Sequence, residues 1–115
     1  MSEDVSRASA SSIDWRRLEE KLEEIVTDST VTFEPATVAN AREFLGLVRD
    51  KCPVPEIAKG YWSTICFFWP GLEFEVFSEH VENYRYPSAG CIDIEHHARH
   101  PGEPFSPDVI SALPG

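Results

Sequence analysis

The chain has 115 residues, which is enough for one domain with a single hydrophobic core. Hydrophobic residues make up 42% of it, including seven Phe, three Trp and three Tyr, so we expect a folded protein rather than a disordered acidic chain. Twenty Asp and Glu against ten Lys and Arg give a formal net charge of −10, and a field of this sign repels nucleic-acid phosphates and anionic membranes. We therefore expect no direct binding of nucleic acid or membrane, and a basic protein is the natural partner.

The three cysteines, Cys52, Cys66 and Cys91, are odd in number and form no Cys-x-x-Cys pair, which argues against a disulfide framework and a zinc knuckle. Reduced thiols fit a cytoplasmic protein. No stretch approaches the roughly 20 apolar residues of a transmembrane helix, and residues 1–12 lack the apolar segment of a secretory signal. The sequence therefore predicts a cytoplasmic protein without a membrane anchor.

Two amphipathic helices are predicted in the first half of the chain. Residues 1–12 are mostly small and polar, so we predict a disordered, solvated tail there and a single domain over residues 13–115. From Ile13 to Val26, apolar residues recur every three or four positions, which predicts the first helix. The second is predicted from about Pro35 to Lys51, because proline suits the first helical position and an apolar stripe follows it.

The pattern changes after Pro53 and Pro55, which end helical structure. Four segments of strand length follow, separated by short turn signals, at residues 63–69, 72–77, 81–86 and 91–95. The first is apolar on both faces, whereas residues 72–77 and 91–95 alternate between apolar and polar. Trp62 and Trp69 flank the most apolar segment and are predicted to lie in the core.

Near the C-terminus, Ser106 as a cap and Pro107 at the first helical position predict one short helix. The predicted fold is therefore α+β, with two amphipathic helices packed on one face of a four-stranded antiparallel β-meander and a short C-terminal helix. The other face of the sheet is expected to be acidic and partly aromatic.

About half of the chain resembles a family of small, uncharacterised bacterial proteins. The matching residues are Ala41-Arg42-Glu43-Phe44-Leu45 in the second helix, Pro53-Val54-Pro55 at its exit, Leu72-Glu73-Phe74-Glu75-Val76 in the alternating strand, and Gly60, Ile65, Trp69 and Tyr84. Lys59 stands where the family has an acidic residue before the glycine. The resemblance implies a helix–sheet architecture, and it carries over no enzymatic activity and no site residue.

The segment between Tyr61 and Ala98 holds six carboxylates against a single basic residue, Arg85. Like charges on neighbouring strands repel, so a sheet that accumulates carboxylates either tolerates the cost or uses it to meet a basic surface. Interleaved aromatic residues are suited to anchoring such a partner. We predict a partner-binding face made of Glu73, Glu75, Phe77, Glu82, Tyr84, Tyr86, Asp93 and Glu95. The alternative is that the acids are only the solvated face of the sheet and the aromatic residues are core.

A second cluster places six potential metal ligands within ten residues: Cys91, Asp93, Glu95, His96, His97 and His100. His96 and His100 have the spacing of two ligands on one helical face, but Pro101 and Gly102 follow at once and disfavour a helix. Beyond His80 and Cys66, the sequence offers no convincing set of partners to complete a zinc site. We predict no metal, no other cofactor and no catalytic residue. The alternative is a metal-binding protein or metal-dependent enzyme that uses His96, His97 and His100 with Asp93.

The sequence favours a small, non-catalytic, cytoplasmic protein that recognises a basic surface of a protein partner. Such a protein could occlude a nucleic-acid-binding site, as an inhibitor, antitoxin or immunity protein would. A third possibility is a self-associating structural component, in which an edge strand or the aromatic face pairs with another copy of the chain.

Overall fold

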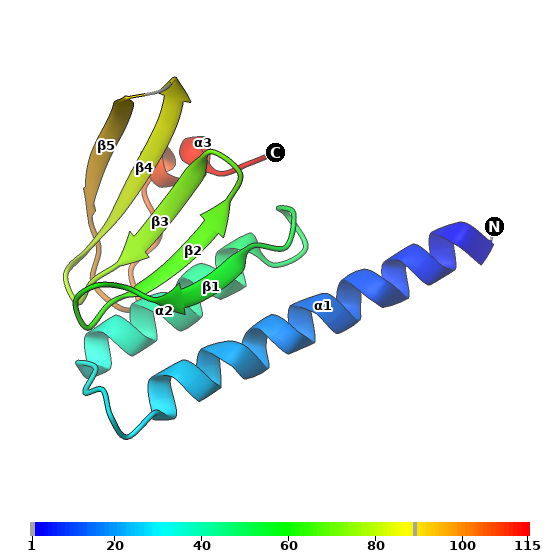
Figure 1. Cartoon of the computed structure of the whole chain (residues 1–115), viewed down its shortest axis with the longest axis horizontal. Coiled ribbons are helices and arrows are strands. Elements are labelled where there is room, and N and C mark those ends of the chain that lie inside the picture. Colours follow the sequence, from blue (N-terminus) through cyan, green and yellow to red (C-terminus); the bar gives the residue numbers. More distant parts are fainter. Residues whose placement is uncertain (1, 89) are drawn as a thin grey trace.

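The computed structural model describes residues 2–88 and 90–115, and the side chains of residues 12–87 and 90–115. The helices are α1 (Ser2–Thr27), α2 (Pro35–Val48) and α3 (Pro107–Ala112). The strands are β1 (Glu56–Lys59), β2 (Ile65–Trp69), β3 (Leu72–Val76), β4 (His80–Ser88) and β5 (Cys91–Ala98). They form one antiparallel sheet in which the spatial order of the strands is their chain order (Figure 1). The fold is α+β with a C-terminal helix, as the sequence predicts.

The sheet has five strands, so the prediction of four strands is wrong. The additional strand is β1, which pairs with β2 along its whole length. The sequence pattern indicates only an extended connection there, because Pro53 and Pro55 precede a segment too short to show alternation. Proline is tolerated at a sheet edge, where its missing N–H is not needed by the ladder, and β1 is an edge strand.

The two long helices occupy different positions relative to the sheet. α2 lies against β2 and β3, whereas α1 lies alongside α2 and the edge strand β1 (Figure 1). This differs in detail from the predicted pair of helices resting on one sheet face. Trp15, Leu18 and Leu22, spaced three and four residues apart, form the buried stripe of α1.

α1 begins at Ser2, whereas the sequence pattern predicts a helix from Ile13. The predicted disordered tail over residues 1–12 stays a prediction, because residue 1 and the side chains of residues 2–11 lie outside the described part of the chain. Between the helices, the Arg42 guanidinium donates to the Glu23 carboxylate at 2.7 Å. This exposed pair adds little to stability.

One hydrophobic core lies between the helices and the sheet. At its centre Phe44 is fully buried, with its ring centroid 4.8 Å from that of Phe67 and 5.0 Å from that of Phe74. Trp69 is 6% exposed, as predicted, and its indole N–H donates to a backbone carbonyl at 2.7 Å. Trp62 is 67% exposed, so its predicted place in the core is wrong. The reason is that β2 begins at Ile65, which leaves Trp62 in the preceding loop.

The segment after β5 is attached to α2 by Arg99, which is only 4% exposed. Its guanidinium donates to the Glu43 carboxylate at 2.6 Å and to Asn40 Oδ1 at 3.2 Å, and it lies 3.9 Å from the centre of the Phe105 ring. Asn40 is fully buried and in turn donates to the Phe77 carbonyl at 3.0 Å. This polar cluster joins α2, the β3–β4 turn and the C-terminal segment.

α3 begins as the sequence predicts. The Ser106 hydroxyl accepts a hydrogen bond from the Val109 N–H at 3.3 Å, and proline occupies the first turn. Val109 and Ala112 are buried against the core, and Arg85 on β4 donates to the Ala112 carbonyl at 3.1 Å. Within residues 2–88 and 90–115, no helix is long and apolar enough to cross a membrane.

Candidate functional site: the open face of the sheet

The face of the sheet turned away from α2, which we call the open face, carries two rows of side chains that run across the strands. Residues opposite each other in neighbouring strands point to the same side of a sheet. One row is Ala58, Cys66, Glu75, Glu82 and His96, and the other is Glu56, Phe68, Glu73, Tyr84 and Ile94. The two rows therefore contain four carboxylates and no Lys or Arg.

Two of these carboxylates are largely buried. Glu75 is 9% exposed, and the side chain of Glu82 is 13% exposed. The β1–β2 loop covers Glu75, because the Thr64 hydroxyl donates to Glu75 Oε2 at 2.5 Å. A Cβ atom at Gly60 would lie 2.1 Å from that hydroxyl and 2.8 Å from the carboxylate. Only glycine lets the backbone approach the carboxylate this closely.

A tyrosine hydroxyl connects the two buried carboxylates. Glu75 and Glu82 are directly opposite each other on β3 and β4. The Tyr84 hydroxyl lies 3.0 Å from Glu75 Oε1 and also contacts Glu82 Oε1. Burial, reinforced by these two carboxylates, raises the pKa of Tyr84, so the hydroxyl keeps its proton at neutral pH. Because it has a single proton, it donates to one carboxylate at a time.

The second oxygen of Glu82 faces two imidazoles. Glu82 Oε2 lies 2.8 Å from His80 Nε2 and 3.2 Å from His96 Nδ1. The His80 ring stacks on Phe77, with centroids 4.1 Å apart and an interplanar angle of 12°. Burial alone would raise the pKa of Glu82, but hydrogen bonds with Tyr84 and His80 and the electrostatic attraction of His96 and His80 outweigh it, and the pKa is lowered. The carboxylate is therefore ionised at neutral pH.

The pKa of Glu73 is shifted in the opposite direction to that of Glu82. Burial and the neighbouring Glu75 carboxylate raise the pKa of Glu73, although hydrogen bonds from the Cys66 thiol and the Tyr86 hydroxyl oppose the rise. Burial and the same carboxylates also raise the pKa of Cys66. The thiol is protonated at neutral pH and is therefore poorly suited to nucleophilic attack.

Exposed apolar side chains accompany the acidic residues. Ile94 is 51% exposed and Tyr86 is 46% exposed. In the loop that covers Glu75, Trp62 packs edge-on against Tyr61, with ring centroids 4.9 Å apart, and Tyr61 is itself 87% exposed. Large aromatic side chains left in solvent next to a charged centre are typical of a surface that meets another molecule.

The open face unites five of the eight residues predicted to bind a partner: Glu73, Glu75, Glu82, Tyr84 and Tyr86. Phe77 follows β3 and supports the His80 ring. Asp93 and Glu95 lie on the other face of the sheet, because they pair with Arg85 and Asn83. There they line a pocket of about 420 Å³ beside α3, and the Asn83 amide donates to Glu95 at 3.1 Å.

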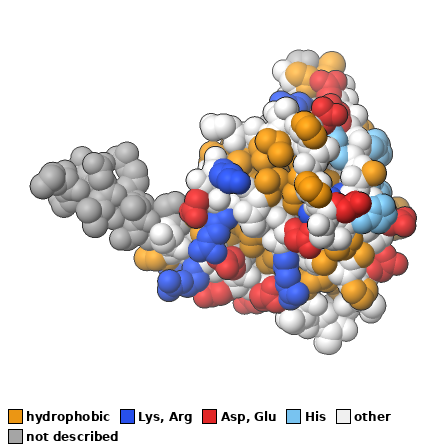
Figure 2. Space-filling model, turned by 180° about the vertical axis from the view of Figure 1, so that it is seen from behind, with side chains coloured by type: hydrophobic (Ala, Val, Ile, Leu, Met, Phe, Trp, Pro, Cys, Tyr) orange, Lys and Arg blue, Asp and Glu red, His pale blue; other side chains and the backbone are white. Residues whose placement is uncertain are grey.

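The three histidines of the predicted cluster do not converge. Seen from behind, histidine side chains gather toward the edge of the molecule that carries β5 (Figure 2). His97 nevertheless points to the face opposite His96, is 8% exposed, and places Nε2 2.6 Å from Asn83 Oδ1. His100 lies beyond β5, where its Nδ1 is 3.3 Å from Glu103. The set of His96, His97 and His100 with Asp93 is therefore not assembled as a single ligand group.

Two contributors to the open face carry no signal in the sequence. Thr64 and Gly60 belong to a loop, and their approach to Glu75 depends on how the β1–β2 hairpin closes. The set of His80, Glu82 and Tyr84 does carry a signal, since residues spaced two apart in a strand share a face. That alternation, followed from Glu82 back to His80, would add His80 to the predicted site.

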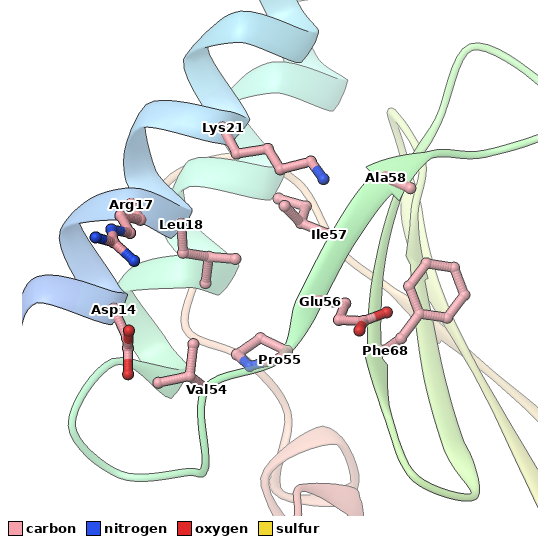
Figure 3. Close-up of a pocket in the computed structure, with 10 residues that line it drawn as sticks. All are labelled: Asp14, Arg17, Leu18, Lys21, Val54, Pro55, Glu56, Ile57, Ala58 and Phe68. Atoms are coloured by element: carbon pink, nitrogen blue, oxygen red, sulfur yellow. The ribbon is translucent and has the colours of Figure 1, made fainter. Parts of the chain in front are cut away.

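A separate groove of about 540 Å³ runs between α1 and β1 (Figure 3). α1 contributes Asp14, Arg17, Leu18 and Lys21, and the opposite wall is formed by residues 54–58 and Phe68. Lys21 extends from α1 toward β1, so this edge of the sheet carries basic as well as acidic side chains. The purely acidic part of the open face lies on β3 and β4.

Comparisons of the chain with protein-family models, with curated proteins and with solved structures found no match. The resemblance to the small bacterial family therefore stays a prediction. Many of its motif positions, such as Phe44, Trp69 and Phe74, lie in the core and bear on the fold rather than on chemistry. What the protein does is best argued from its open face.

Proposed function

We propose that the protein is a small, non-catalytic binding protein whose open face recognises a basic surface on a protein partner. The observation that carries this proposal is the row of carboxylates on β3 and β4, with no Lys or Arg in the two rows across the sheet. Surfaces that bind nucleic acid are basic. An inhibitor, antitoxin or immunity-type protein that occludes such a surface therefore fits this chemistry.

The neighbouring carboxylates of Glu73 and Glu75 repel each other, and a bound cation would relieve this repulsion. Glu73 is partly buried beside Glu75, and together with burial that neighbour raises the pKa of Glu73. A guanidinium placed against Glu73 would stabilise the ionised form and could donate to both carboxylate oxygens at once. Part of the binding free energy then comes from repulsion that exists in the free protein.

Charge and apolar contact have separate roles in the proposed complex. The net charge of −10 speeds the encounter with a basic partner, and this contribution weakens as salt rises. Tyr86, Ile94 and Trp62 offer exposed apolar area that salt screens little. We therefore expect an association rate that falls with ionic strength and a residual affinity that does not.

Binding is favoured over catalysis by the state of the groups on the open face. The Cys66 thiol is buried and its pKa is raised, and the Tyr84 hydroxyl serves as a hydrogen-bond donor between two carboxylates. Neither group is activated for attack on a substrate. The three cysteines are free thiols, which suits the proposed cytoplasmic location.

The test is a pair of charge reversals that change the net charge equally. Glu73→Lys alters the open face, whereas Glu20→Lys alters an exposed position on α1. Each variant and the wild type would be used to capture partners from native host lysate at low salt, with elution by rising salt and identification by mass spectrometry. We expect one basic protein, bound at least about tenfold more weakly by Glu73→Lys and nearly unchanged by Glu20→Lys.

Two outcomes would contradict the proposal. Equal losses in the two variants would mean that net charge alone, and not the open face, attracts the partner. Salt-insensitive self-association, measured by light scattering, would favour the structural component that pairs with its own copies. Circular dichroism of both variants checks that neither loss reflects unfolding.

A further inference from the structure

The geometry points to a divalent transition-metal site on the open face, formed by His80, Glu82 and His96. These residues come from two neighbouring strands. Glu82 and His96 are directly opposite each other on β4 and β5, and His80 precedes Glu82 by two residues, on the same face of β4. The three potential ligand atoms, two imidazole nitrogens and one carboxylate oxygen, all lie within 4.8 Å of one another.

The separations are close to those that a metal requires. Zinc binds histidine nitrogen and carboxylate oxygen at about 2.0–2.2 Å, so ligand atoms at the corners of a tetrahedron lie roughly 3.3–3.5 Å apart. Glu82 Oε2 is 2.8 Å from His80 Nε2 and 3.2 Å from His96 Nδ1. Small movements of the Glu82 and His96 side chains would open these distances without moving the strands.

Surrounding residues hold two of the three ligands in place. The Tyr84 hydroxyl contacts Glu82 Oε1, which leaves Oε2 directed at the histidines. Phe77 stacks on the His80 ring and limits its rotation. Residues that hold metal-binding side chains in position in this way are expected to raise the affinity for the metal. The side chain of His96 is 66% exposed, so the remaining coordination positions face solvent.

The ligand set selects a class of metal. Two imidazoles with one carboxylate suit Zn²⁺, Co²⁺, Ni²⁺ or Cu²⁺, whereas Mg²⁺ and Ca²⁺ prefer oxygen ligands alone. Three protein ligands with an open position are the arrangement that lets a metal bind a water molecule or a group from another molecule. The site lies beside Tyr84 on the β4–β5 side of the open face, so a metal there would also change the charge presented to a partner.

This inference is independent of the proposed partner binding, because Glu73→Lys leaves all three ligands in place. The test uses protein without a histidine tag, stripped of metal with a chelator and titrated with Zn²⁺ in a calorimeter. We expect one Zn²⁺ per chain. Substitution of Co²⁺ should give visible absorption bands of a tetrahedral or five-coordinate site, and imidazole NMR signals of His80 and His96 should shift.

The variants His96→Gln and His100→Gln form a matched pair, because both side chains are more than half exposed and only the first is a proposed ligand. We expect His96→Gln to weaken Zn²⁺ binding at least about tenfold and His100→Gln to leave it unchanged. Glu82→Gln, which keeps the shape of the side chain, should weaken it as well. Binding below one Zn²⁺ per chain, or equal losses in His96→Gln and His100→Gln, would overturn the inference.

Discussion

The Tyr84 hydroxyl offers the sharpest test of the polar arrangement on the open face. Tyr84→Phe keeps the ring and removes the one proton that lies between Glu75 and Glu82. These two carboxylates are opposite each other on β3 and β4 and are largely shielded from water. The substitution therefore leaves two like charges without the donor that separates them.

The expected loss follows from the burial and charge of the acceptors. A hydrogen bond to a charged group contributes about 1.5–3 kcal/mol, and the hydroxyl serves one carboxylate at a time, so we expect a loss of about 2 kcal/mol at pH 7. For a domain of this size, that loss lowers Tm by roughly 8 °C. Neither figure requires any change in the hydrophobic core.

The loss should depend on pH with a definite sign. The pKa of Glu82 is lowered in the folded state, so its contribution to stability is present above the ordinary value of 4.5 and disappears as the pH falls through the folded value. Tyr84→Phe removes one cause of that lowering. The difference in unfolding free energy between variant and wild type should therefore be largest near neutral pH and shrink in acid.

Urea unfolding followed by tryptophan fluorescence, at pH 7 and at pH 3 with a chelator present, measures both effects. Tyr86→Phe is the matched control, because its hydroxyl is 3.5 Å from Glu73 and the residue is 46% exposed. We expect the control to change stability by less than about 0.5 kcal/mol. A Tyr84→Phe protein as stable as the control, or equally destabilised at both pH values, would refute the reasoning.

Three further predictions concern stability measured by urea unfolding. Phe44→Ala should cost about 3–5 kcal/mol because its fully buried ring fills the centre of the core, whereas Ile110→Ala, at a position 51% exposed, should cost much less. Gly60→Ala should destabilise the protein, because the new Cβ would lie 2.1 Å from a hydroxyl oxygen. Its control, Gly46→Ala in α2, meets nothing within 4 Å and should stabilise the protein by about 0.5–1 kcal/mol. Effects of equal sign in the two variants would contradict this account. Glu73→Gln should stabilise the protein by roughly 0.2–1 kcal/mol at pH 7. The pKa of Glu73 is raised in the folded state, so its ionisation lowers stability as the pH rises above 4.5. The gain should therefore vanish at pH 3.

The strands that alternate and end at tight turns are predictable from the sequence. Pro70 and Gly71 place Trp69 opposite Leu72, and that pairing sets the register of β2 with β3. The positive φ of Gly71, 72°, is the backbone conformation that such a turn needs. β1 escapes prediction because a strand of four residues carries almost no period, and its edge position tolerates nearby prolines.

The division of the acidic residues between the two faces depends on an irregularity that the sequence does not reveal. At the tip of the β4–β5 hairpin Ser88 pairs with Cys91, and continuation of that register would place Glu95 opposite Tyr84, on the open face. The pairing shifts by one residue between Arg85 and Ser88, and Glu95 pairs with Asn83 instead. A shift of one residue moves every following side chain to the other face. The same shift brings His96, rather than His97, to Glu82.

The chain-order arrangement of the strands has a consequence for the kinetics of folding. Each strand pairs only with its neighbours in the sequence, so the sheet can form hairpin by hairpin, and single hairpins close in roughly 1–10 μs. The contact between Arg99 and Asn40 instead joins residues 59 positions apart. The entropy cost of closing that loop must be met before the contact can stabilise the folding chain. We expect this contact to form after the rate-limiting step, so that Arg99→Met accelerates unfolding and leaves the folding rate nearly unchanged.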